Sequence, residues 1–102
     1  MKECCKAFLN EQFDGDQDVV VEIYVEYVSS TGEKLAEIEK ATASADWTAV
    51  DKLAHAVKGN ALAVGDHDVV ETAIALRGAA TLGDSAQAAG LVARLKQLAA
   101  EL

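Results

Sequence analysis

The sequence lacks proline altogether and has few aromatic and few basic residues. Its 102 residues are 5% aromatic and carry nine Lys and Arg against seventeen Asp and Glu. Without proline little interrupts a long helix, and the apolar half of the chain is rich in alanine and leucine, which favour helices. The net charge of −8 argues against nucleic acid and against an anionic membrane surface as partners, because both attract basic proteins. We therefore expect a single all-α domain over residues 1–102 that binds neither nucleic acid nor membrane.

Cysteine is scarce as well, since Cys4 and Cys5 are the only two. Adjacent cysteines close no useful loop and have no metal-site spacing, so we expect two small apolar side chains in a reducing compartment and no metal bound by this chain. No apolar run resembles a secretory signal or approaches the roughly 20 residues that cross a bilayer. These absences predict a cytoplasmic protein.

Hydrophobic residues recur at helical spacing through most of the chain. The expected helices cover residues 2–12, 17–44, 47–64, 68–82 and 85–101. The second contains Gly32 after a polar stretch, but a mid-helix glycine costs only about 1 kcal/mol, so we expect one long helix, with or without a bend. Asp68 and Glu71 have the spacing of a capping box at the start of the fourth. Short connections between long helices predict an antiparallel up-and-down four-helix bundle with a short extra N-terminal helix.

The third helix carries the most informative pattern. At about 100° per residue its apolar positions cluster in one direction, which must face the core. They are Val50, Leu53, Ala54, Val57, Ala61 and Val64. His55 lies about 140° from that direction, so it points outward at mid-helix. Thr48 and Leu62 point nearly the same way, Gly59 follows one turn later, and Lys58 lies on the flank.

This outward face is unusual for an exposed helix. Gly59 costs stability where alanine or lysine would be preferred, but it removes a side chain beside the imidazole of His55. An exposed histidine is largely neutral at pH 7 and can act as a nucleophile or base. No helper for a catalytic dyad lies at helical spacing, His67 is expected to be a solvated residue, and no phosphate-binding loop is present. The pattern fits either an incidental surface histidine or an imidazole that serves a partner's active site.

The stretch from His55 to Gly65 resembles the signature of histidine phosphotransfer (HPt) domains, written His-x-Leu-Lys-Gly-Ser-[Ser/Ala]-x-x-[apolar]-Gly. The matching residues are His55, Lys58, Gly59, Ala61, Val64 and Gly65. Val57 replaces the usual leucine, Asn60 replaces a small residue, and Leu76-Arg77 stands where the family often has Leu-Glu. Chain length and helix order are also similar to the family.

The resemblance implies a phosphorelay intermediate of two-component signalling, a phosphocarrier rather than an enzyme. His55 would accept a phosphoryl group from the aspartyl phosphate of one receiver domain and pass it to the aspartate of another. Lys58 would offset the phosphate charge and Gly59 would give steric clearance. Partner docking would involve Thr48, Asp51, Lys52 and Leu62. The expected partners are response-regulator receiver domains and a hybrid sensor histidine kinase; Mg²⁺ would come with the receiver, and this chain would bind no cofactor and act as a monomer.

Two other hypotheses compete with this one. A degenerate domain of the same fold would bind a receiver without carrying phosphate, but it would be expected to have lost its histidine. An unrelated helical dimerisation domain would show an unbroken apolar stripe on an outward face, whereas the outward positions here are apolar only at scattered points.

Overall fold

The computed structural model of the protein describes residues 1–102 and consists of five α-helices without a strand. The helices are α1 (Glu3–Gln12), α2 (Gln17–Ala43), α3 (Trp47–Ala63), α4 (His67–Leu82) and α5 (Ser85–Ala100). The all-α class and the five helices are confirmed, and no helix end differs from its predicted position by more than one residue. α2 runs unbroken through Gly32, as expected for one long helix.

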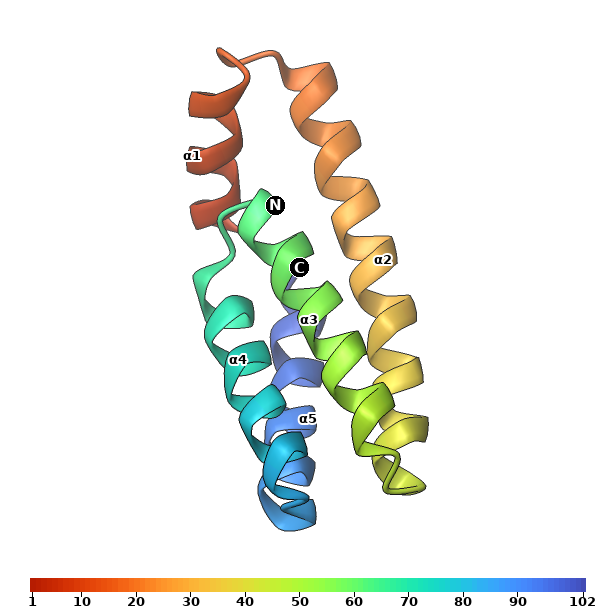
Figure 1. Ribbon diagram of the computed structural model, residues 1–102. Helices are drawn as coiled ribbons and strands as arrows, with labels where there is room; N and C mark the ends of the chain where they lie inside the picture. Colours follow the sequence, from red (N-terminus) through yellow and green to blue (C-terminus); the bar gives the residue numbers. More distant parts are fainter.

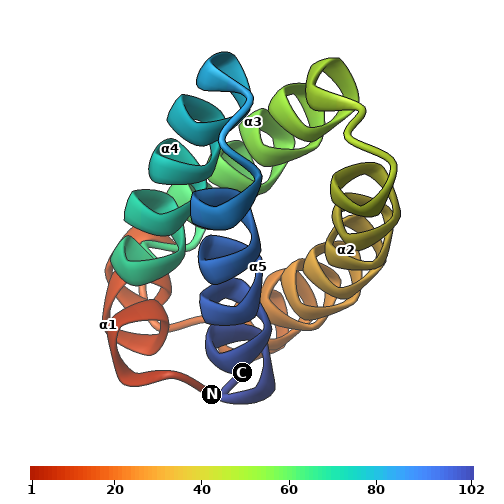
Figure 2. The same cartoon turned by 90° about the horizontal axis from the view of Figure 1, so that it is seen from below.

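The four long helices surround a common interior (Figures 1 and 2). α3 packs against α2 and α4, and α5 packs against α4 and α2, so the contacts close a ring. α1 lies beside the N-terminal part of α2, at the upper end in Figure 1. The molecule measures 43 × 20 × 19 Å, and its long axis matches the length of α2. None of these helices combines the length and the apolar character that crossing a bilayer requires.

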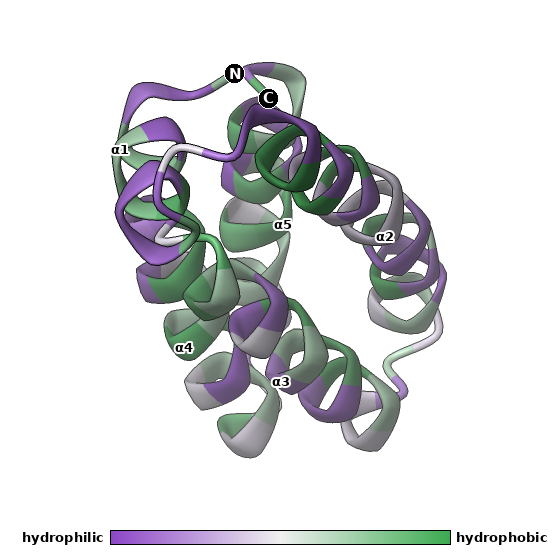
Figure 3. Cartoon of the chain, turned by 90° about the horizontal axis from the view of Figure 1, so that it is seen from above, coloured by the Kyte–Doolittle hydropathy of each residue, from purple (hydrophilic) through white to green (hydrophobic).

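The core follows the predicted apolar faces. On α3 the buried side chains are Val50, Ala54, Val57 and Ala61, all of them on the predicted stripe. Hydropathy colouring shows the apolar faces of the helices turned toward one another and the polar faces turned outward (Figure 3). Three helices begin at an aspartate whose carboxylate accepts a backbone N–H of the first turn; these residues are Asp16, Asp46 and Asp84. The apolar faces and the aspartate caps, both visible in the sequence, therefore account for how the helices around the site are placed.

The start of α4 differs from the prediction. The N-cap position belongs to Asp66, not to Asp68, and Asp66 makes no capping hydrogen bond. Its carboxylate is instead fully buried, where it accepts a hydrogen bond from the Lys2 ammonium at 2.6 Å and another from the Tyr27 hydroxyl at 2.7 Å. The capping-box interpretation was wrong because the aspartate that begins the helix is recruited by partners far away in the sequence. The Asp66 carboxylate thus links the turn between α3 and α4 to Tyr27 of α2 and to Lys2 at the N-terminus.

The buried carboxylate of Asp66 affects the pKa values of neighbouring groups. Burial, aided by the hydrogen bond to Asp66, raises the pKa of the Tyr27 hydroxyl. Burial, reinforced by the charge of Asp66, raises the pKa of the Cys5 thiol to about 12. The pKa of Lys2 is also raised: burial alone would lower it, but the hydrogen bond and charge of Asp66 outweigh that effect. Cys5 therefore stays a protonated core side chain, as expected for a structural cysteine.

Candidate functional site

The site is centred on His55, which is exposed at the middle of α3, as the helical spacing predicted. Thr48 and Leu62 lie within about 20° of the direction of His55 around the helix, so the three residues form a line along the exposed face. Asp51 and Lys58 lie on one flank of this line, and Lys52 and Gly59 lie on the other. The imidazole is thus presented on an open helical surface and not in a cleft.

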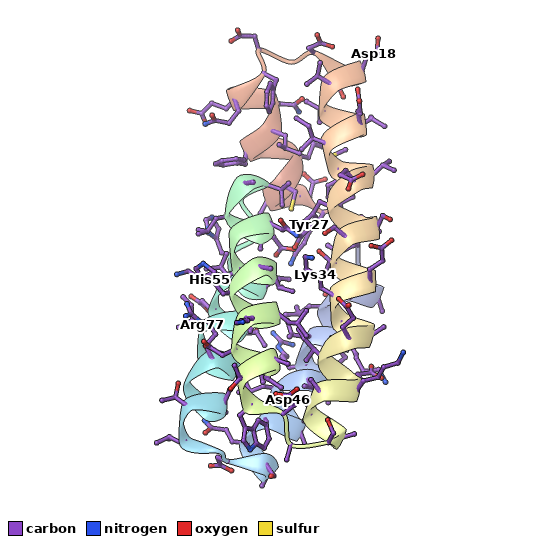
Figure 4. All side chains as sticks on the ribbon, turned by 45° about the vertical axis from the view of Figure 1, so that its right-hand side comes forward. Asp18, Tyr27, Lys34, Asp46, His55 and Arg77 are labelled. Carbon is purple, nitrogen blue, oxygen red and sulfur yellow. The ribbon has the colours of Figure 1, made fainter.

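The flank that carries Asp51 faces α4 and supplies a contact that the sequence analysis did not find. The Arg77 guanidinium approaches the imidazole with Nη1 3.0 Å from His55 Nδ1, and its Nε lies 2.9 Å from Asp51 Oδ1. Figure 4 shows His55 and Arg77 on the same side of the molecule, on neighbouring helices. Arg77 bridges two α3 residues that are one turn apart. The expectation that no partner for a catalytic dyad lies at helical spacing on α3 is not contradicted, because Arg77 comes from α4 and only donates to the ring.

The donor chemistry of arginine fixes the state of the neutral imidazole in this arrangement. A guanidinium has only donors, so a hydrogen bond from Arg77 requires an unprotonated Nδ1 as acceptor. A neutral ring then carries its proton on Nε2. Nε2 makes no hydrogen bond within the protein, so it is the ring nitrogen of this exposed residue that is left without a partner. The only sequence signal for Arg77 was its place where the resembling family often has glutamate.

Lys58 and Gly59 lie on the sides of α3 that their helical spacing predicted. Lys58 is half-buried on the Asp51 flank and forms no ion pair within the chain, so its ammonium can reach an anion held at His55. Gly59 is exposed, and a Cβ added there would meet no atom within 4 Å. Nothing in the fold of this chain requires glycine at this position, and the steric clearance expected of Gly59 stays a prediction.

The residues predicted to dock a partner are spread over the same face. Thr48 and Lys52 are exposed, and Leu62 is 51% exposed. Thr48 also lines a shallow depression between α3 and α4, which Asp51 shares. Asp51 forms an ion pair with Arg77 within the chain, and its predicted part in docking stays a prediction. Ile74, which is 50% exposed and lies one turn before Arg77 on α4, adds an apolar side chain that sequence analysis missed.

Asn60 has a structural explanation. Its side-chain amide donates to the Ser30 hydroxyl of α2 at 3.0 Å, so it points away from the face that carries His55. The larger residue at this signature position therefore links α3 to α2 without crowding the imidazole.

The remaining reactive side chains do not assemble into a second centre. His67 is exposed in the first turn of α4, as predicted. Cys4 and Cys5 are both free, and Cys5 is buried. No group of three or more His, Cys, Asp and Glu side chains comes together in a way that could hold a metal ion.

The comparisons with known proteins give one finding. A family model described as the Hpt domain matches residues 22–102, which include α3, α4, α5 and most of α2. No curated protein and no solved structure matches the chain. The match covers all the residues that surround His55.

Proposed function

The chain belongs to the Hpt domain family, and from that membership and the exposure of His55 we propose that it is a phosphorelay intermediate. His55 accepts a phosphoryl group from the aspartyl phosphate of one receiver domain and passes it to the aspartate of another. The observation that carries the proposal is an accessible mid-helix imidazole beside a glycine with open space around it. Family membership by itself implies a histidine-containing phosphotransfer module of two-component signalling.

The chemistry needs little from this chain beyond the imidazole. A lone pair of the ring attacks phosphorus while the bond from phosphorus to the aspartyl oxygen breaks, and that electron pair returns to the receiver's carboxylate. The remaining ring proton leaves to solvent. Such transfers depend on in-line positioning and charge neutralisation, and the receiver supplies both its aspartate and Mg²⁺. This chain binds no cofactor of its own and is a phosphocarrier rather than an enzyme.

Charge around His55 suits a transferred phosphoryl group. Three cationic side chains surround the imidazole, namely Lys52, Lys58 and Arg77. The carboxylate of Asp51 also lies beside it, but Asp51 forms an ion pair with Arg77. A chain with a net charge of −8 thus gathers cations at this face. Lys58, which lacks an ion pair, is the residue best placed to pair with phosphate oxygens.

The proposal includes the setting in which this chain works. We place it in the cytoplasm as a monomeric domain over residues 1–102, an antiparallel up-and-down bundle with the face of His55 left open. Its partners are response-regulator receiver domains and a hybrid sensor histidine kinase. Docking uses Thr48, Lys52 and Leu62. The large exposed apolar residues are scattered over α2, α3 and α4 and on either side of α1, which does not favour the alternative of a dimerisation domain.

The second candidate is a receiver-binding module that carries no phosphate. It predicts the same docking face but requires no reactive imidazole. The presence of His55, Lys58 and Gly59 together on one exposed face favours phosphotransfer over simple binding.

A labelling experiment separates the two candidates. The chain is incubated with a receiver domain carrying labelled aspartyl phosphate and Mg²⁺, and the product is assayed for phosphate that is labile in acid and stable in base. We expect label on the native chain and on His67→Gln, and none on His55→Gln. His67 is a matched control because it is the other histidine and is also exposed. Binding of receivers without label on the native chain would support the second candidate instead.

A further inference from the structure

The contact between Arg77 and His55 determines which ring nitrogen of the neutral imidazole carries the proton, and this affects the proposed chemistry. The guanidinium is fixed at two points, since Nη1 lies 3.0 Å from His55 Nδ1 and Nε lies 2.9 Å from Asp51 Oδ1. Arg77 is 35% exposed and Asp51 is 41% exposed in their side chains, so water competes for both contacts. Arg77 can therefore leave these contacts. We call the bridge closed when Arg77 contacts both His55 and Asp51.

A closed bridge stabilises the tautomer that cannot attack through Nε2. When Nδ1 accepts from Arg77, the proton of the neutral ring resides on Nε2, and the lone pair of that nitrogen belongs to the ring π-system. Attack through Nε2 requires the proton to move to Nδ1, where it would point at the guanidinium. Attack through Nδ1 is blocked by Arg77 itself. Either route needs Arg77 to withdraw from Nδ1.

We infer that Arg77, held by Asp51, is a positioning residue that acts as a latch on Nδ1 of His55 and must open for phosphoryl transfer. This inference rests on the proposed function of His55. The charged groups around the imidazole are Asp51, Lys52 and Lys58 from α3 and Arg77 from α4, and among them only Arg77 has a contact with the ring.

The same bond has the opposite effect once the phosphoryl group is in place. In a ring phosphorylated at Nε2 and deprotonated at Nδ1, Nδ1 is an acceptor, so Arg77 can donate to it again. Departure of the phosphoryl group is assisted when Nδ1 takes up a proton, because the ring then leaves as neutral imidazole. A guanidinium bound at Nδ1 opposes that protonation. The latch should therefore slow loading and also prolong the lifetime of the phosphohistidine.

The first test reads the proton directly. Nitrogen-15 NMR of the unmodified protein, at a pH where the ring is neutral, distinguishes the two tautomers of His55. We expect the Nε2–H form to dominate in the native chain and the Nδ1–H form to gain population in Arg77→Gln and in Asp51→Asn. Arg94→Gln is the matched control, because Arg94 is the other arginine and is exposed on α5 without an ion pair. Equal tautomer populations in the native chain and Arg77→Gln would overturn the inference.

The second test measures lifetime without a receiver. Each variant is phosphorylated chemically with phosphoramidate, and loss of the phosphohistidine is followed over time. We expect Arg77→Gln to lose phosphate about three- to tenfold faster than the native chain and Arg94→Gln. Arg77→Lys should be intermediate, since one ammonium lacks the guanidinium fork that bonds both partners. Equal lifetimes in all four proteins would overturn the inference.

These measurements separate this inference from the proposed function. A shifted tautomer and a shortened lifetime in Arg77→Gln support the latch whether or not a receiver can load His55. If Arg77→Gln shows both effects but the native chain takes no label from any phosphorylated receiver, the phosphorelay role fails and the latch stands. If receivers label the native chain and Arg77→Gln at equal rates, with no tautomer change, the role stands and the latch fails.

Discussion

Substitution of Gly59 should stabilise the protein and impair the proposed phosphoryl transfer at the same time. A Cβ at Gly59 meets nothing within 4 Å, and the same holds at Gly32 and Gly90, which also lie inside exposed helical stretches. Glycine inside a helix costs about 1 kcal/mol relative to alanine, so each Gly→Ala variant should gain about that much stability. For a domain of this size the gain corresponds to an increase in Tm of about 4–8 °C.

The functional effect should be confined to Gly59. A glutamate there adds bulk and negative charge one turn from His55, in the space that a receiver would occupy. Overpacking of a close interface costs about 1–3 kcal/mol, which corresponds to a reduction of about five- to 150-fold in the apparent second-order rate of phosphoryl transfer. Gly90→Glu should transfer at the native rate. Both variants should retain the helical circular dichroism of the native chain.

The assay is a rapid-quench measurement of label passing from a phosphorylated receiver to His55, beside thermal unfolding of the same samples. A Gly59→Lys variant separates the two contributions, because it adds similar bulk with a charge that suits phosphate. If Gly59→Glu unfolds like the native chain and also transfers like it, the clearance assigned to Gly59 is refuted. If Gly59→Ala is less stable than the native chain, the account of the open helical surface is refuted.

Three further predictions concern the fold that carries the site. Asp66→Ala should cost about 2–4 kcal/mol in the free energy of unfolding, chiefly because the buried Tyr27 hydroxyl loses its acceptor. A double-mutant cycle with Tyr27→Phe should give a coupling energy of about 1 kcal/mol or more. Additive losses in the two single variants would contradict the network. Stability should fall above about pH 9: the pKa values of Cys5 and Tyr27 are raised by burial, so the unfolded chain releases these protons first, at up to about 1.4 kcal/mol per pH unit and group. Urea unfolding from pH 8 to pH 11 checks this, and Cys5→Ala should flatten the slope. Gly65→Ala should destabilise the chain, because Gly65 has φ +69° and an added Cβ would lie 2.6 Å from the ring of Phe8; an unchanged Tm would refute the assigned packing.

Local patterns were sufficient to predict the helices and most of the core. Periodicity placed Val50, Ala54, Val57 and Ala61 inside and His55 outside, because side-chain direction on a helix follows from residue spacing alone. The cap at Asp46 was predictable for the same reason, since its hydrogen bond closes within three residues. The assigned roles of His55, Lys58 and Gly59 in phosphotransfer stay predictions until label transfer is measured.

Long-range polar pairing was not predictable from these patterns. Asp66 stands at a helix start, where an aspartate usually caps, yet its partners are 64 and 39 residues away. Nothing in the local sequence distinguishes a capping aspartate from one that is buried by a distant lysine and tyrosine. The pairing matters to the site because it fixes the turn between α3 and α4, and hence the register in which α4 passes α3.

That register decides what kind of site the chain has. α3 alone presents a histidine flanked by a lysine and a glycine, and the helical wheel describes all three without reference to any other helix. Arg77 belongs to α4 and is 22 residues from His55, so its sequence neighbourhood indicates only a surface cation. The turn through Gly65 and Asp66 sets the axial offset at which Arg77 meets both Asp51 and the imidazole. α3 thus supplies the proposed nucleophile, while α4 supplies the hydrogen bond that we infer selects its tautomer. A change of offset by one helical turn, about 5.4 Å, would leave His55 exposed and Lys58 in place but would remove the contact with Nδ1. Variants of the turn that keep the helices folded should therefore reproduce the tautomer shift of Arg77→Gln without altering any residue that touches His55.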